Sequence, residues 1–168
     1  QPMGPYRYHA TDRSAAMLAV AREKAACSNS PVVFTEADFT NYRVAEPVDV
    51  VLLLFDGLNY VLEPEGICAL LRSTHAALRP GGLFIFDQST PANSLGREAD
   101  FEDAGETEAF RYVRRSRYDP VRRLHTTLFE LEIGGQRYRE RHVQRAYTQR
   151  EIEALLKTQA FQIEAAYD

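Results

Sequence analysis

The stretch VDVVLLLFDGLNY, residues 48–60, decides how the rest of the chain is expected to fold. Six apolar residues run from Val50 to Phe55 without alternation and stop at Asp56. An unbroken apolar run of this length is typical of an interior strand in a parallel sheet that helices cover on both faces. Such sheets bind ligands beyond the carboxyl ends of their strands. We therefore expect a binding site next to Phe55.

The segments around this strand follow an α/β order. Before it, the sequence predicts a strand at 6–11, a helix with Ser14 as its N-cap, and a strand at 31–35. After it, we expect a helix with Pro64 in its first turn and a strand at 83–86. This order predicts right-handed crossovers and a Rossmann-like, mostly parallel sheet flanked by helices.

The pattern changes after the fourth of these strands. Residues 89–105 are polar and contain Gly, Pro and Asn, so we expect a loop with a short helix there. Three segments then alternate like antiparallel strands joined by turns, at 110–118, 124–133 and 136–147. We therefore predict an antiparallel β-hairpin insertion after the fourth core strand.

The chain ends with a predicted helix and strand. Thr148 and Glu151 have the spacing of a capping box, which opens a helix. Residues 161–167 are expected to form a last strand.

Composition is that of a globular domain. The chain has 168 residues, 45% of them hydrophobic and 26% charged, with a net charge of −4, which fits one domain. No apolar run approaches the roughly 20 residues that cross a membrane, and residues 1–5 lack a signal-peptide pattern, so we expect a cytoplasmic protein. Cys27 and Cys68 are interpreted as buried free thiols, and no Cys/His cluster indicates a metal.

Charge is unevenly distributed along the chain. Between Arg111 and Arg150 there are 11 Arg and four acidic residues, whereas residues 98–108 hold six acids and no base. A basic face can attract an acidic substrate or nucleic acid. The alternative is a solvated hairpin face, neutralised in part by the acidic stretch or by a partner subunit. Nucleic acid is disfavoured because the aromatics form no stacking motif and the net charge is negative.

Several phrases, in their order and spacing, resemble class I S-adenosylmethionine-dependent methyltransferases of the small-molecule type. They are TDRSAAML at 11–18 with AREKA at 21–25, EADF at 36–39, LLFDGLNY at 53–60 and LRPGGLFIFD at 78–87. The segments RHVQRAY at 141–147 and IEALL at 152–156 are similar to the substrate-side insertion of these enzymes. The resemblance implies a single domain with a cofactor-binding core at 1–88, an insertion at 89–147 and a C-terminal helix and strand at 148–168.

The resemblance implies that S-adenosylmethionine is the cofactor and S-adenosylhomocysteine the product. Asp12 would accept the two ribose hydroxyls, because two carboxylate oxygens match a vicinal diol. Asp38 would accept the adenine amino group. Apolar contacts to the cofactor would come from Met17, Phe39, Leu54 and Phe55. From position alone, the two acids also fit capping and turn roles, and Met17 fits the core.

The resemblance also places catalytic and substrate-binding residues. The sulfonium methyl is already activated, so the enzyme aligns the acceptor and excludes water, and a base serves a protonated acceptor. His142 is the first candidate base, followed by Tyr60, with Asp87 and Tyr147 behind them. Substrate contacts are assigned to three residues: Asn59, Arg145 and Tyr147. A structural role for each of these residues is the competing interpretation.

The chain departs from the family pattern at its beginning. The glycine-rich first loop is absent, and only Gly4 precedes Asp12. Without the strand that carries this loop, residues 50–55 would form a bare apolar edge. Three explanations stay open: the sequence is a fragment, further disordered segments interrupt it, or the chain is a degenerate relative, and the first two are favoured because such an apolar edge would aggregate. Two hypotheses are carried for the function. The first is a methyltransferase that acts on N or O of a small molecule, with a homodimer through the hairpins left open. The alternative is a non-catalytic methyltransferase-like binding or assembly module that has lost the cofactor loop.

Overall fold

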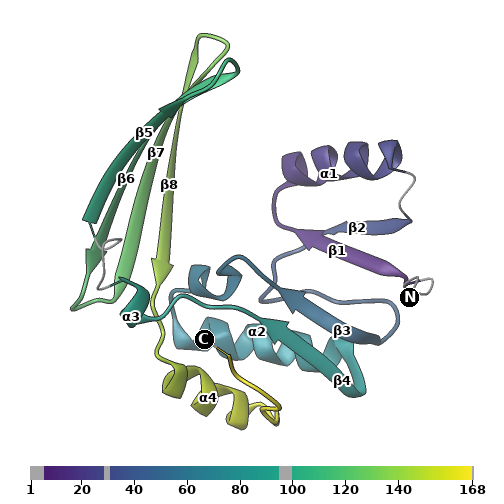
Figure 1. Ribbon diagram of the computed structural model, residues 1–168. Coiled ribbons are helices and arrows are strands. Elements are labelled where there is room, and N and C mark those ends of the chain that lie inside the picture. The colour runs from purple at the N-terminus through teal and green to yellow at the C-terminus, as the bar shows by residue number, and fades with distance from the viewer. Residues whose placement is uncertain (1–5, 29–30, 95–99, 168) are drawn as a thin grey trace.

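The structure, a computed structural model, describes residues 6–28, 31–94 and 100–167 (Figure 1). The elements are β1 (Tyr8–Asp12), α1 (Ala15–Cys27), β2 (Val32–Glu36), β3 (Val48–Leu53), the 3₁₀ helix η1 (Gly57–Tyr60), α2 (Pro64–Ala77), β4 (Leu78–Phe86), α3 (Pro91–Ser94), β5 (Asp100–Glu106), β6 (Phe110–Asp119), β7 (Leu124–Ile133), β8 (Gln136–Arg145) and α4 (Gln149–Thr158). This order confirms the predicted α/β fold with parallel strand pairs and an antiparallel sheet after β4. Among the described helices, none combines the length and the apolar composition that a membrane span requires.

The parallel strands form two pairs. β1 pairs with β2 and β3 pairs with β4, and the described residues contain no strand that joins these pairs into one sheet. One edge of β3 is therefore unpaired, and Val50 and Leu52 are 43% and 60% exposed. The prediction that both faces of β3 are buried is wrong for the described chain, because the face that carries Val50 and Leu52 is left exposed. The bare apolar edge expected for a chain without the glycine-rich strand is confirmed.

The helix α1 is only partly covered, since it packs against the two-stranded β1–β2 sheet. Leu18 is buried, as predicted for the face that packs on the sheet, but Met17 is 58% exposed. Cys27 is exposed and Cys68 is half-buried, and both are free. The prediction that both thiols are buried is therefore wrong.

The predicted helix starts are confirmed. The Ser14 hydroxyl accepts a hydrogen bond from the Met17 N–H, and Pro64 is at the start of α2. Thr148 and Glu151 form both hydrogen bonds of a capping box at α4. These are short-range interactions, which explains why sequence spacing alone predicts them.

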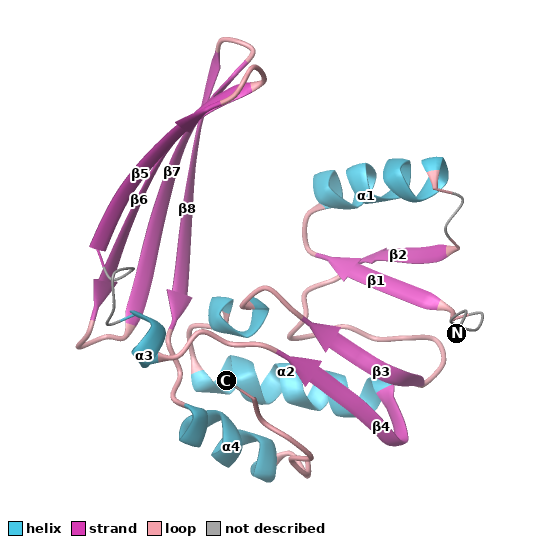
Figure 2. Ribbon diagram, viewed as in Figure 1, coloured by secondary structure: helices cyan, strands magenta, loops and turns pink. Residues whose placement is uncertain are grey.

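The hydrophobic core lies where η1, α2 and α4 meet. Figure 2 shows α2 beside the β3–β4 pair and α4 next to α2, with the carboxyl ends of these strands directed toward the foot of the antiparallel sheet. The buried cluster consists of Leu58, Val61, Ile67, Leu71, Tyr147, Ile152 and Leu156. Burial of each large apolar side chain contributes about 1.5–3 kcal/mol, so this cluster anchors the segments on either side of the candidate site.

The strands β5, β6, β7 and β8 form one antiparallel sheet, which extends away from the parallel pairs (Figure 1). The three predicted strands are confirmed, although β8 ends at Arg145 rather than at residue 147. Gly134 and Gly135 have φ values of 57° and 77°, which suits the tight turn of a two-residue hairpin.

A loop with a short helix was expected at residues 89–105. The short helix is present as α3, but residues 100–105 belong to strand β5, so the prediction of a loop there is wrong. Its acidic side chains pair with arginines of β6: Glu102 with Arg115, Asp103 with Arg114 and Glu106 with Arg111. Acidic residues have low intrinsic strand propensity, and here the neighbouring strand overrides it. The same pairs confirm that the acidic stretch partly neutralises the basic hairpins.

The chain after α4 does not form the predicted strand. Residues 161–167 have no regular secondary structure, and Phe161 packs its ring against Phe84 and edge-on to His75. Phe161 therefore packs on α2 and β4, whereas Ile163 and Tyr167 are 43% and 93% exposed.

The pair formed by Glu151 and Arg123 links α4 to the β6–β7 turn and predicts acid-sensitive stability. Each carboxylate oxygen accepts a guanidinium hydrogen bond at 2.7 Å, and these bonds lower the pKa of Glu151 to about 2 from its ordinary 4.5. A lowered folded-state pKa gives stability that is present above pH 4.5 and is lost as the pH falls toward about 2.

We expect Glu151→Gln to lower the free energy of unfolding at neutral pH by about 1 kcal/mol, a small effect because the pair is partly exposed. The difference from wild type should shrink steadily below pH 4.5. Urea unfolding across this pH range measures it. Glu153→Gln is the matched control and should show neither effect, because Glu153 is also on α4 but has no ion pair within the described chain.

Candidate functional site

The structure brings together the two residues predicted to be catalytic. The Tyr60 hydroxyl lies 2.8 Å from Nδ1 of His142, although 82 residues separate them. Tyr60 is at the end of η1 and His142 is near the end of β8. The other imidazole nitrogen, Nε2, is 3.4 Å from a carboxylate oxygen of Glu140, and the ring of Phe129 packs edge-on against the imidazole. The result is a chain of carboxylate, imidazole and phenol.

The electrostatics of this chain keep the phenol protonated. Burial raises the pKa of Tyr60 above its ordinary value, and the negative charges of Asp56 and Glu140 raise it further. A protonated Tyr60 hydroxyl can donate a hydrogen bond to Nδ1 of His142. We infer the matching tautomer, in which the Nε2–H of His142 is directed toward Glu140.

Sequence reasoning missed Glu140. A signal was present, because residues 140 and 142 are two apart on one strand and so lie on the same face of the sheet. The register pairs Glu140 with Phe129 and His142 with Thr127, so both side chains are on the face that meets Tyr60.

Asn59, predicted to contact substrate, is 1% exposed and bridges three segments. Its amide nitrogen donates to the carbonyl oxygens of Ser89 and Arg145, both at 2.7 Å. Its amide oxygen accepts from the Ser89 N–H at 2.9 Å. The side chain thus joins η1, the segment after β4 and the end of β8, and its polar atoms are all engaged by backbone groups.

Arg145 and Tyr147, also predicted to contact substrate, hold the foot of β8 on the core. Arg145 donates to the Leu62 carbonyl at 2.8 Å, and its guanidinium lies over the Tyr147 ring. The Tyr147 hydroxyl donates to the Val61 carbonyl at 2.8 Å. Burial raises the pKa of Tyr147 to about 12, so it stays protonated at neutral pH. Their substrate contacts stay predictions, and the structure assigns each of them a backbone partner.

Asp12 is the last residue of β1 and Asp38 follows β2, so the two acids lie at the same end of this parallel pair. The Asp12 carbonyl accepts from the Ala37 N–H, so the two chain segments continue side by side beyond β1 and β2. One oxygen of Asp12 accepts from Ser14 N–H, and one oxygen of Asp38 accepts from the N–H and hydroxyl of Thr40. The Thr40 bonds lower the pKa of Asp38. Within the described chain, the second oxygen of each carboxylate has no hydrogen-bond partner.

The apolar residues assigned to the cofactor divide into two groups. Phe55, Leu54 and Met17 are exposed to 90%, 46% and 58%, so each presents apolar surface to solvent. Phe39 instead packs against the core cluster. Asp87, a weaker candidate base, accepts the backbone N–H groups of Phe55 and Asp56.

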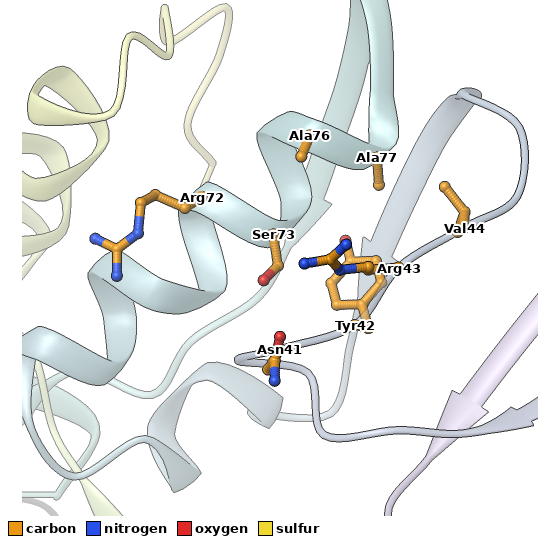
Figure 3. Close-up of a pocket in the computed structure, with 8 residues that line it drawn as sticks. All are labelled: Asn41, Tyr42, Arg43, Val44, Arg72, Ser73, Ala76 and Ala77. Carbon is orange, nitrogen blue, oxygen red and sulfur yellow. The ribbon is translucent and has the colours of Figure 1, made fainter.

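A cavity of about 350 Å³ lies between α2 and the loop that follows β2 (Figure 3). It is lined by Asn41, Tyr42, Arg43, Val44, Arg72, Ser73, Ala76 and Ala77. In Figure 3 the Arg72 side chain extends away from Tyr42 and Arg43. Since no predicted site residue lines it, this cavity is separate from the residues assigned to the cofactor and the methyl acceptor.

Comparison with known proteins shows which proteins this chain is similar to. The model of the methyltransferase domain family matches residues 1–82. Residues 1–82 are thus similar to this family. The chain is also 26% identical over 157 residues to "Putative methyltransferase YqeM" of Bacillus subtilis (strain 168). The aligned region covers 90% of this chain and 63% of that protein. The chain thus spans less than two thirds of the length of this relative.

Solved methyltransferase structures share the fold of the whole described chain. An S-adenosylmethionine-dependent methyltransferase from Clostridium acetobutylicum superposes with a TM-score of 0.83 at 20% identity, covering 92% of this chain and 63% of that one. CalS10, an amino pentose methyltransferase from Micromonospora echinaspora, has a TM-score of 0.71 at 19% identity and covers 91% and 65%. These likenesses confirm the Rossmann-like fold class, including the antiparallel insertion.

Proposed function

We propose that this methyltransferase domain transfers a methyl group from S-adenosylmethionine to a nitrogen or oxygen of a small molecule. The observation that carries the proposal is the hydrogen bond between Tyr60 and His142 at the foot of the antiparallel sheet, next to the carboxyl ends of β3 and β4. The similar structures support it: CalS10 was solved with S-adenosylmethionine bound, and MtfA, a glycopeptide N-methyltransferase, was solved with S-adenosylmethionine and with S-adenosylhomocysteine.

The residues present fit the cofactor. In the described chain, Asp12 and Asp38 each keep a carboxylate oxygen without a partner, and these suit ribose hydroxyls and an adenine amino group. Phe55, Leu54 and Met17 present exposed apolar surface for the adenosine. When bound, the cofactor supplies a methyl group that its sulfonium already activates.

Residues of this chain accept the proton that the methyl acceptor loses. As the acceptor gains the methyl group, its N–H or O–H proton passes to the Tyr60 oxygen, and the phenolic proton passes to Nδ1 of His142. Glu140, beside Nε2, stabilises the imidazolium that forms. General-base assistance of this kind contributes about 10²- to 10⁴-fold to the rate.

Calorimetric titration of the full-length protein with S-adenosylhomocysteine tests the proposal. We expect saturable one-to-one binding in the micromolar range, on the order of −8 kcal/mol. Failure to bind at millimolar ligand would contradict it.

Asp12→Asn should weaken this binding about tenfold, which corresponds to about 1.4 kcal/mol. The Asn side-chain oxygen can still accept from Ser14 N–H, so the turn after β1 is kept while the negative charge that binds the ribose is lost. Glu36→Gln is the matched control, because Glu36 is the register partner of Asp12 on β2. Equal affinity of wild type and Asp12→Asn would remove Asp12 from the site.

The alternative, a non-catalytic binding or assembly module, is favoured by one observation. Within the described residues, β3 has an unpaired apolar edge that another strand could cover. The titration separates the two functions, since this module would not bind the product. The division of the domain at residues 88 and 147, a cytoplasmic location and a homodimer through the hairpins stay proposals.

A further inference from the structure

The turn that follows β3 has an unusual backbone conformation. Phe55 and Asp56 are consecutive left-handed residues, with φ values of 61° and 55°. This region is unfavourable for residues with a Cβ, and glycine normally occupies it. Gly57 is the next residue, yet the left-handed conformation falls on Phe55 and Asp56 instead. Some other interaction must therefore stabilise the turn.

The Asp87 carboxylate hydrogen-bonds the backbone of this turn. One carboxylate oxygen accepts the Phe55 N–H at 3.1 Å and the other accepts the Asp56 N–H at 2.9 Å. The Asp87 N–H in turn donates to the Leu53 carbonyl at 3.4 Å, extending the β3–β4 pairing by one residue. Hydrogen bonds to a charged acceptor are stronger than those between neutral groups. Because both oxygens are engaged, Asp87 is better suited to hold backbone than to serve as a base.

The turn directs an aromatic ring into solvent. Phe55 is 90% exposed and is outside the core cluster and its packed neighbours. Folding alone gives no reason to hold a large apolar ring in this way on a strained backbone. Strained conformations that persist often belong to ligand sites, and this ring lies beyond the carboxyl end of β3, where α/β sheets bind ligands.

We propose that Asp87 is a positioning residue for the cofactor: its carboxylate holds the 55–56 turn so that the Phe55 ring packs against the adenosine portion. This inference rests on the proposed function. It predicts that Asp87 contributes to cofactor affinity only through the conformation of the turn and the ring that the turn carries.

The test measures S-adenosylhomocysteine binding by calorimetry on full-length variants. Asp87→Ala should weaken binding about tenfold or more. Adding Asp56→Gly should recover most of this loss, because glycine adopts a positive φ without the help of Asp87. In a Phe55→Ala background, Asp87→Ala should weaken binding by less than about threefold, since the two changes act through one ring. Asp49→Ala, at the other end of β3, is the matched control.

The outcomes separate the two proposals. Absence of binding by wild type contradicts the proposed function itself. Binding by wild type with Asp87→Ala within about threefold of it overturns only the role of Asp87. If Asp87 has a purely structural role, Asp87→Ala will weaken binding by the same factor in the wild-type and the Phe55→Ala backgrounds. That result would also overturn the proposal. If Asp87→Ala does not fold, Asp87→Asn, which keeps one acceptor oxygen, is compared with and without Asp56→Gly under the same criteria.

Discussion

Replacing His142 with Ala is expected to lower kcat for methyl transfer by about 100- to 1,000-fold, with the affinity for S-adenosylhomocysteine unchanged. In the proposed mechanism the imidazole accepts the Tyr60 proton, and without it the phenol cannot pass on a proton taken from the substrate. Tyr60→Phe removes the same proton-transfer path and should lower kcat by the same factor. The Tyr60→Phe/His142→Ala double variant should be no slower than either single variant, because the two side chains act as one unit.

Activity against a panel of small amines and hydroxyl compounds, with product binding measured in parallel, checks this prediction. His75→Ala is the control, since His75 is on α2 and contacts Phe161 rather than the site. Glu140→Gln should have a smaller effect, about tenfold, because it removes only the charge beside Nε2. A His142→Ala variant that binds product and keeps a kcat within about threefold of wild type would exclude proton transfer through this pair.

Asn59→Ala is expected to lower the free energy of unfolding by about 3 kcal/mol, which corresponds to a fall of about 6–12 °C in Tm. The substitution removes three hydrogen bonds at 2.7 to 2.9 Å and leaves the backbone groups of Ser89 and Arg145 without these partners next to the core. Buried polar groups that lose their partners carry the full cost of desolvation.

Asn59→Asp should be at least as damaging, because it has the same shape but places negative charge against two carbonyl oxygens. Asn41→Ala is the control: Asn41 is exposed, and we expect a change within about 0.5 kcal/mol. Thermal and urea unfolding measure all three variants. A loss below about 1 kcal/mol for Asn59→Ala would mean that solvent replaces these bonds, and the bridge would then not be structural.

Local signals predicted the elements that depend on nearby residues. The Ser14 cap, the capping box at Thr148 and the turn at Gly134 each involve groups a few residues apart, and each is confirmed. The strand β5 escaped prediction because its acidic sequence has low strand propensity and is stabilised by arginines across the sheet.

The candidate site shows the same division. Residue type and position selected Tyr60 and His142, but only the fold brings a phenol and an imidazole 82 residues apart to 2.8 Å. Asn59 and Tyr147 have polar groups that suit a substrate equally well in sequence, yet tertiary packing buries both and directs their polar atoms to backbone partners.

The sequence by itself determined the α/β class, the helix starts, the hairpin turns and the types of residue available for chemistry. Each of these depends on periodicity or on contacts within a few residues. Only the tertiary structure decided that β3 has an exposed edge among the described residues, that Glu140 lies beside the His142 imidazole, and that Asp87 accepts hydrogen bonds from the Phe55 turn. These features depend on which distant segments pack together, and the free energy of that packing is not contained in any one stretch of sequence.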